Sequence, residues 1–176
     1  MPASKTLLIP ALLALVLAGC ESTKVPNCPA AAILADTAQV TQFRAGAVQD
    51  LSGEAYTAYL TGISSDCYVD KKRGMSNSSA ILSFRATRAP TAEAAEYTIP
   101  YFLAVIAGER VLSKQIFSVT FRFAPGAAVA NFTDTVDETD IKIEADHRPT
   151  DYQLTAGLQI SEAQQAYNKK RGPYVQ

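Results

Sequence analysis

The only histidine of the chain is the first residue to test for chemistry, because imidazole is a common catalytic base and metal ligand. His147 stands directly before Arg148-Pro149, in a stretch that the proline marks as a loop. A hydrolase would also need a nucleophile within hydrogen-bond reach of this base, and the sequence contains no G-x-S-x-G motif. We therefore expect His147 to be an exposed loop residue, and we expect the protein not to be an enzyme.

Four acidic residues form a second group that could do chemistry. Asp134, Asp137, Glu138 and Asp140 supply the carboxylate oxygens that Ca²⁺ prefers. Their spacing lacks the glycine and the distant Glu of an EF-hand loop, and on a strand Asp137 would point away from the other three. A charged edge strand, which resists unwanted strand pairing, is the simpler interpretation. We expect neither a metal nor another cofactor.

A cysteine near the N-terminus offers a different chemistry, covalent lipidation. The apolar residues 7–18 are too few to cross a membrane as a helix, which takes about 20, but suit the centre of a secretory signal. The run ends in Leu17-Ala18-Gly19-Cys20, which resembles the lipobox of bacterial lipoproteins. The resemblance implies cleavage before Cys20 and acyl chains on its sulfur and its new amine. A plain signal peptide that ends in a chance cysteine is the alternative.

Lipidation would decide where the protein is held. Two or three acyl chains give stable membrane attachment, whereas a single chain binds only marginally. Residues 1–19 would then be the signal peptide, and the short polar residues 20–29 a tether for a domain outside the bilayer. We expect the periplasmic side of the cell envelope, with the outer membrane favoured over the inner one. The formal net charge of −1 argues against a nucleic-acid partner.

Cys28 and Cys67 remain once Cys20 carries lipid. Export to an oxidising compartment favours a disulfide between them. An antiparallel hairpin of residues 33–43 and 54–64, with Phe43 near Glu54, would place the two cysteines close together at its open end. Two free thiols or a metal-binding pair are the alternatives, and a metal site would need further ligands.

From residue 30 onward the sequence has the pattern of an all-β protein, with alternating apolar residues in short runs between turns that contain Gly or Pro. We predict seven strands, at residues 31–43, 54–64, 79–88, 96–107, 111–123, 131–143 and 151–160. Residues 30–160 are therefore expected to form a two-sheet sandwich of the immunoglobulin or fibronectin III type. A small antiparallel barrel is the alternative, and it would need one more strand.

The hydrophobic period changes in residues 161–176. Ser161 and Gln164 have the spacing of a capping box, apolar residues then recur at helical spacing, and Gly172-Pro173 ends the pattern. The chain is thus predicted to end in a short amphipathic helix and a tail.

The most apolar stretch, residues 97–123, is predicted to be a hairpin with one of two turns. A two-residue Gly108-Glu109 loop suits the glycine but would pair Tyr101 with Ile116 and mix the two faces. A three-residue loop that also includes Arg110 gives one almost wholly apolar face, and a buried face fixes register strongly. We prefer this second register, which pairs Tyr97, Ile99, Tyr101 and Leu103 with Phe121, Val119, Phe117 and Gln115.

The preferred register leaves apolar side chains on the opposite face of the hairpin, where a sandwich strand is usually polar. Phe102, Ile106, Leu112 and Ile116 are therefore the candidate residues for binding a partner. Alternatively, the C-terminal helix lies across this face and buries it.

Several short motifs support a family resemblance. Cys28-Pro29 with Ile33-Leu34-Ala35-Asp36 resembles small envelope lipoproteins of an uncharacterised, alphaproteobacterial-type family, as do Gly62-Ile63-Ser64, Pro100-Tyr101-Phe102 and Ala166-Tyr167-Asn168. The resemblance implies a β-rich periplasmic domain and supplies no catalytic residues. We expect a lipid-anchored structural or adaptor protein, an accessory subunit of an envelope or membrane protein complex. A lipoprotein that binds a small ligand or a glycan is the alternative.

Overall fold

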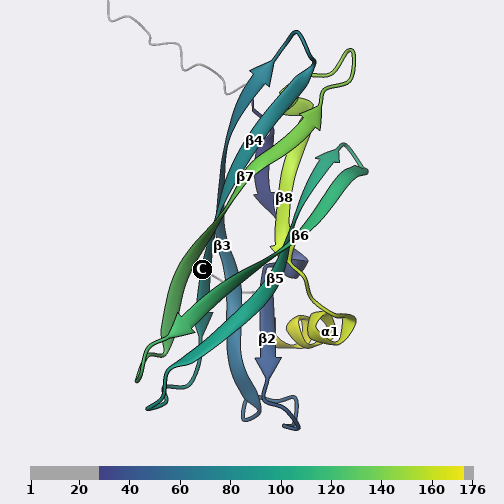
Figure 1. Cartoon of the computed structure of the whole chain (residues 1–176). Coiled ribbons are helices and arrows are strands. Elements are labelled where there is room, and N and C mark those ends of the chain that lie inside the picture. The colour runs from purple at the N-terminus through teal and green to yellow at the C-terminus, as the bar shows by residue number, and fades with distance from the viewer. Residues whose placement is uncertain (1–27, 173–176) are drawn as a thin grey trace, which may run out of the picture.

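A computed structural model of the chain describes residues 28–172, which form two four-stranded sheets packed face to face and one short helix (Figure 1). Sheet A contains, in spatial order, β1 (Ala30–Ile33), β8 (Tyr152–Leu158), β5 (Ala95–Ala107) and β6 (Arg110–Phe123). Sheet B contains β2 (Gln39–Phe43), β3 (Glu54–Asp70), β4 (Met75–Thr87) and β7 (Val129–Lys142). The predicted two-sheet sandwich is confirmed. Each sheet keeps two edge strands, so the described residues do not form a closed barrel.

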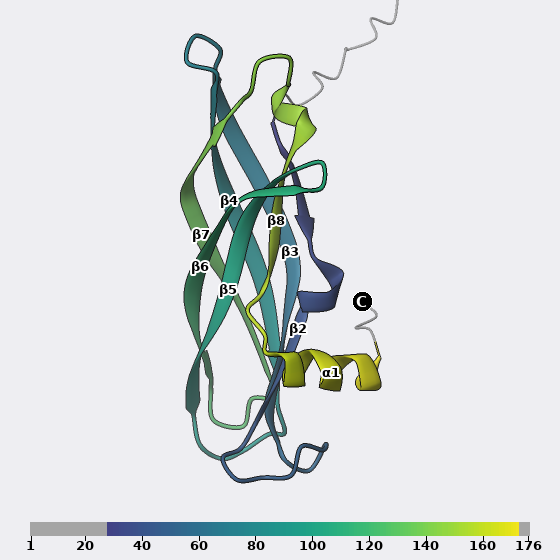
Figure 2. The ribbon, with the colours of Figure 1, turned by 90° about the vertical axis from the view of Figure 1, so that its right-hand side faces the viewer.

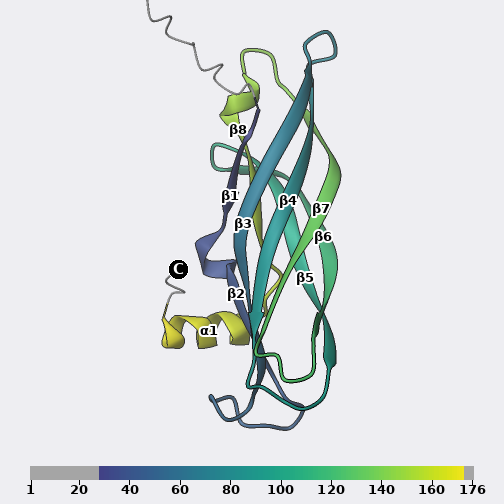
Figure 3. The ribbon, with the colours of Figure 1, turned by 90° about the vertical axis from the view of Figure 1, so that its left-hand side faces the viewer.

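One predicted strand, residues 31–43, is two strands that belong to different sheets. The short 3₁₀ helix η1 (Ala35–Thr37) separates β1 from β2 and carries the chain from sheet A to sheet B (Figure 3). β1 pairs in parallel with β8, whereas β2 pairs antiparallel with β3. The sandwich therefore has eight strands in the described region instead of about seven. Neither glycine nor proline interrupts residues 31–43, so the sequence pattern alone does not mark the crossing.

The hairpins otherwise follow the predicted order, with longer strands. Phe43 pairs with Glu54, as predicted, and β3 then continues to Asp70 before turning into β4. β3 and β4 form a hairpin within one sheet, whereas the third and fourth strands of an immunoglobulin constant domain lie in different sheets. The chain thus has the sandwich architecture of that class with a strand order of its own.

The core lies between the inner faces of the two sheets, which stay close together along the elongated body seen from the side (Figure 2). Aromatic rings fill much of it. The Phe121 ring stacks on Phe132 with ring centroids 4.5 Å apart, and Phe132 stacks in turn on Phe84. Tyr101 and Tyr152 are fully buried, whereas Phe132 is partly buried at the edge of this layer. Fully burying such side chains stabilises a fold by about 1.5–3 kcal/mol each, which makes this aromatic layer a principal source of stability.

The C-terminal helix α1 (Glu162–Arg171) begins as predicted. The hydroxyl of Ser161 accepts a hydrogen bond from the Gln164 backbone N–H, and the Gln164 side chain accepts one from the Ser161 backbone N–H. These reciprocal bonds form the predicted capping box. A second 3₁₀ helix, η2 (Pro149–Asp151), leads into β8.

Candidate functional site: a hairpin edge and its surroundings

The β5–β6 hairpin turns over two residues, not three. Gly108 and Glu109 form the loop, and Ala107 pairs with Arg110. Gly108 has a φ of +59°, a conformation that glycine adopts without steric cost. The predicted three-residue loop is therefore wrong, and the glycine indicated the turn correctly.

The predicted side-chain pairs are nevertheless confirmed, because a β-bulge lies close to the turn. Ile106 pairs with Val111 and Val105 pairs with Ser113, so Leu112 is an extra residue in β6. The bulge shifts the register by one position and restores the apolar inner face beyond it. The pairs there are Leu103 with Gln115, Tyr101 with Phe117, Ile99 with Val119 and Tyr97 with Phe121.

The part of β6 next to the turn is exposed. β6 is an edge strand of sheet A, and all its residues from Arg110 to Ile116 are exposed. Three of them carry large aliphatic side chains, which usually lie in a core. Val111 is 63% exposed, Ile116 62% and Leu112 41%. We call these three residues the hairpin patch. An edge strand presents unpaired backbone N–H and C=O groups, and adjacent apolar side chains make this edge a template for another strand.

Two of the four predicted binding residues, Phe102 and Ile106, lie outside this patch. Phe102 is only 6% exposed, because its ring packs against Gly157 of β8 and Lys114 Nζ lies 4.2 Å from the ring centroid. Ile106 is half-buried beside it. Leu112 and Ile116 are exposed, which a binding role requires, and Val111 is exposed beside them. The sequence analysis did not include Val111, because the preferred register paired Ile106 with Leu112, whereas Ile106 in fact pairs with Val111.

Helix α1 does not cover the hairpin, contrary to the alternative that the sequence left open. It packs on β2 at the edge of sheet B, where the Tyr167 ring meets Phe43 edge-on with ring centroids 5.0 Å apart (Figure 2). The physical reason is a polar cluster centred on Glu54. Its carboxylate accepts hydrogen bonds from the Tyr167 hydroxyl at 2.8 Å and from Arg171 Nη1 at 2.5 Å.

This cluster shifts the pKa of both helix residues upward. The hydrogen bond to the Glu54 carboxylate raises the pKa of the Tyr167 hydroxyl. Partial burial is the largest single effect on Arg171 and disfavours its charged form, but the hydrogen bond to Glu54 and the negative charges nearby, that of Glu54 first, together outweigh burial and raise the pKa of the guanidinium. Arg171 also donates to Thr41 Oγ1 of β2 and to Thr57 Oγ1 of β3, so the last turn of α1 is tied to both strands at this edge of the sheet.

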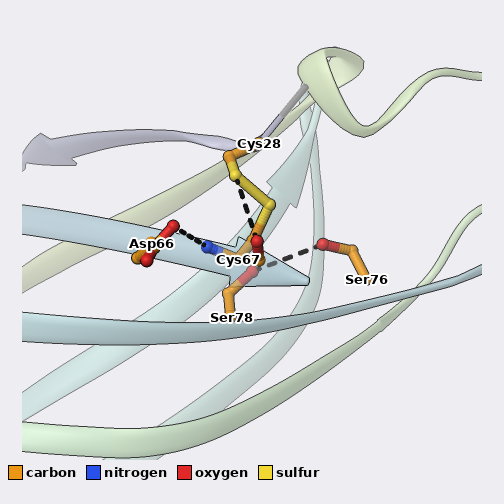
Figure 4. Close-up of a disulfide and its surroundings, with 5 residues drawn as sticks. All are labelled: Cys28, Asp66, Cys67, Ser76 and Ser78. Carbon is orange, nitrogen blue, oxygen red and sulfur yellow. Dashed lines mark hydrogen bonds between the residues drawn. A yellow bond between two sulfur atoms is a disulfide. The ribbon is translucent and has the colours of Figure 1, made fainter. Parts of the chain in front are cut away.

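Cys28 and Cys67 form a disulfide (Figure 4). The predicted pairing is confirmed, but the two cysteines do not lie at the open end of one hairpin, as the sequence argument assumed. Cys28 precedes β1 of sheet A, while Cys67 lies on β3 of sheet B, so the bond joins the two sheets. Beside it, the Asp66 carboxylate accepts a hydrogen bond from the Cys67 backbone N–H. Cys20 and most of the predicted tether lie outside the described residues, as does the predicted signal peptide.

His147 is exposed in the loop between β7 and η2, as predicted. Its Nδ1 atom lies 3.3 Å from the backbone oxygen of Ala145 and 3.9 Å from the Glu144 carboxylate. A groove of about 470 Å³ adjoins it, and no Ser, Thr, Cys or Tyr of the described chain lines that groove. The groove thus offers His147 no hydroxyl or thiol nucleophile to activate.

The acidic residues of β7 do not converge on one point. Asp134 accepts a hydrogen bond from the buried Tyr101 hydroxyl at 2.9 Å, whereas Asp140 accepts one from the Asn77 side chain. An irregularity opposite Ser78 and Ala80 breaks the alternation, so Asp134 and Asp140 do not share a face as the sequence suggested. Within residues 28–172, no three His, Cys, Asp or Glu side chains are placed to hold a metal ion.

A scan against protein-family models finds no match, and searches of curated proteins and of solved structures find no similar chain. In the described part of the chain, no helix is both long and apolar enough to span a membrane.

Proposed function

We propose that this protein is a lipid-anchored structural or adaptor protein of the periplasmic side of the cell envelope. In this proposal acyl chains on Cys20 hold it at the membrane, and the hairpin patch binds an envelope protein as part of a membrane-associated complex. The single observation that carries the adaptor role is the run of exposed residues at the start of an edge strand, with Val111, Leu112 and Ile116 among them.

The position of the hairpin patch supports a partner near the membrane. Ala30 pairs with Gln153, Gln153 with Ile106 and Ile106 with Val111, so the four residues form one row across sheet A. Ala30 is the first residue of β1, and the chain leads from it back to Cys28 and the proposed anchor. A tether attached at this end of the sheet holds the patch at the side of the domain that is closest to the bilayer.

The expected partner offers an extended segment with apolar side chains. Such a segment would extend sheet A by pairing its backbone with the free edge of β6, and the hairpin patch would receive its alternate side chains. Main-chain hydrogen bonds provide affinity in this mode, while the apolar contacts select the partner.

Site-specific photo-crosslinking in cells tests the adaptor role. A benzophenone amino acid replaces Val111 in one strain and Val48, which is 72% exposed in the loop before β3, in a control strain. We expect a discrete crosslinked product from position 111 and none from position 48. Ile116→Lys should reduce that product at least tenfold without changing the amount of protein. Equal products from both positions, or none from position 111, would contradict the adaptor role.

The anchor is tested separately. Metabolic labelling with palmitate should mark the parent protein, and Cys20→Ser should abolish the label and release the protein from membranes. Unchanged labelling of the Cys20→Ser protein would contradict lipidation at this residue but would leave the crosslinking result standing.

A further inference from the structure

A groove of about 540 Å³ lies between η1, β2 and α1, away from the hairpin patch. η1 and α1 both stand out on the same side of the sandwich (Figure 3), and the groove lies between them. Its lining combines buried residues, among them Leu60 and Gln39, with exposed ones such as Ala35 and Lys169. The residues that line it are Ile33, Ala35, Asp36, Ala38, Gln39, Leu60, Gln165, Asn168, Lys169 and Gly172.

Two buried polar atoms of this lining have no hydrogen-bond partner in the described structure. Gln39 is 7% exposed, and its side-chain Nε2 is buried with no acceptor. The Asn168 Oδ1 atom is buried with no donor. The orientation of the Asn168 amide is fixed, because its Nδ2 donates a hydrogen bond of 2.7 Å to the backbone oxygen of Gln39. Buried polar groups are almost always paired, so an orphaned donor and an orphaned acceptor in one groove point to a ligand.

We propose that this groove binds an extended peptide segment. In extended backbone the N–H and C=O of one residue point to the same side, which is how antiparallel strands exchange paired hydrogen bonds. Both atoms are shielded from solvent, so the two amide side chains would have to turn slightly toward the groove on binding. One such residue would then donate its N–H to Asn168 Oδ1 and accept a hydrogen bond from Gln39 Nε2. A small apolar side chain of the peptide would rest on Ile33, Ala38 and Leu60.

The pair of orphaned atoms selects against other classes of ligand. A carboxylate or a fully ionised phosphate ester offers acceptors only and would leave Asn168 Oδ1 unpaired, while an ammonium group offers donors only and would leave Gln39 Nε2 unpaired. The described lining contains no aromatic ring on which a sugar or a base could stack. One residue of an extended peptide satisfies both atoms at once, and its side chain also suits the apolar residues of the lining.

Nuclear magnetic resonance titration of the chain from residue 20, with Cys20→Ser to keep it unacylated, tests this site. The probe is acetyl-Ala-Val-Ala N-methylamide, and methyl β-glucoside is the comparison ligand. We expect saturable shifts of the side-chain amide signals of Gln39 and Asn168 with the peptide. The proposal is overturned if the peptide gives no saturable shift, if the glucoside binds at least as tightly, or if only ordered water pairs with the two atoms.

Matched variants separate binding at this groove from a general effect. Gln39→Leu removes the donor at nearly constant volume and should weaken peptide binding at least tenfold, whereas Gln42→Leu changes an exposed glutamine of the same strand and should bind as the parent does. Ala35→Phe adds a ring to the exposed rim and should block the groove even if Gln39→Leu fails to fold. Binding that persists in Ala35→Phe and in a folded Gln39→Leu would place the peptide elsewhere and overturn the proposal.

Discussion

The disulfide between Cys28 and Cys67 joins the segment that enters sheet A to β3 of sheet B, with the two Cα atoms 5.6 Å apart. The cysteines are 39 residues apart in sequence, and the closed loop contains β1, η1, β2 and most of β3. β1 is a short edge strand that pairs only with β8 in the described structure. The covalent bond therefore secures the strand to which the proposed tether is attached.

Reduction of this bond should destabilise the domain substantially. Closing a loop of this length lowers the entropy of the unfolded chain by an amount equivalent to about 4 kcal/mol at 25 °C in the chain-entropy model. We expect the urea midpoint of unfolding to fall when dithiothreitol is added. The Cys28→Ser, Cys67→Ser double variant should start at the lower midpoint and show no response to dithiothreitol. A parent protein with the same midpoint in both conditions would contradict a structural role for the disulfide.

The register of the β5–β6 hairpin illustrates how far the sequence predicts this fold. Apolar alternation identified the pairs beyond the bulge, and Gly108 identified the two-residue turn, yet the two signals disagree by one position. An extra residue in one strand is the physical resolution, because a bulge allows the turn and the buried face each to keep its preferred geometry. A prediction that keeps the same register along the whole hairpin must reject either the apolar alternation or the two-residue turn at Gly108.

The position of α1 could not be predicted in the same way. Periodicity and the capping box at Ser161 define where the helix begins, but they describe only its own sequence. Its docking depends on Glu54 of β3, which is more than a hundred residues away and has no pattern that links it to Tyr167 or Arg171. The groove beside α1 was missed for the same reason, since Gln39 and Asn168 meet only once the helix has docked.

Glu54→Gln should loosen α1 while the sandwich stays folded. The substitution removes the charge that Arg171 and the Tyr167 hydroxyl both bind, at a site where Glu54 is largely shielded from water. Because Arg171 keeps some access to solvent, we expect a loss of about 1–2 kcal/mol. Hydrogen–deuterium exchange of residues 162–171 should become faster, with little change in β4 and β5. The matched control Glu96→Gln, at an exposed position on β5, should leave exchange in α1 unchanged.

Alkaline pH should destabilise the fold through buried tyrosines. Burial, with a smaller effect of Tyr97, raises the pKa of Tyr56 to about 12, and burial and the bond to Asp134 raise the pKa of Tyr101. Both folded-state pKa values lie above the unfolded value of about 10, so the stabilisation is complete below pH 10 and declines as the pH rises toward 12. Urea midpoints at pH 9 and pH 11 measure the effect.

Two single variants check the origin of this pH dependence. Tyr56→Phe should reduce the fall in the urea midpoint between pH 9 and pH 11, because the variant lacks the hydroxyl that ionises in the unfolded chain. Tyr101→Phe should do the same, and at pH 7 it should also lose about 1 kcal/mol of stability with the hydrogen bond to Asp134. Midpoints that fall equally in the parent and in both variants would place the alkaline transition in other groups.

Gly157→Ala should be far more costly than an alanine at most other glycines of a sandwich. A Cβ atom at Gly157 would lie 2.0 Å from Thr37 Oγ1 and 2.6 Å from Phe102 Cζ, so both η1 and the Phe102 ring would have to move. Overpacking of this kind typically costs about 1–3 kcal/mol. Gly62→Ala is the matched control, because its Cβ would meet Ser83 at an ordinary 3.5 Å, and we expect a change below about 1 kcal/mol.

Since Phe102 would be displaced toward solvent, Gly157→Ala should also enlarge the apolar surface beside Ile106, detectable as increased binding of a hydrophobic dye. Equal unfolding midpoints for the two alanine variants would show that η1 does not pack on β8 in solution.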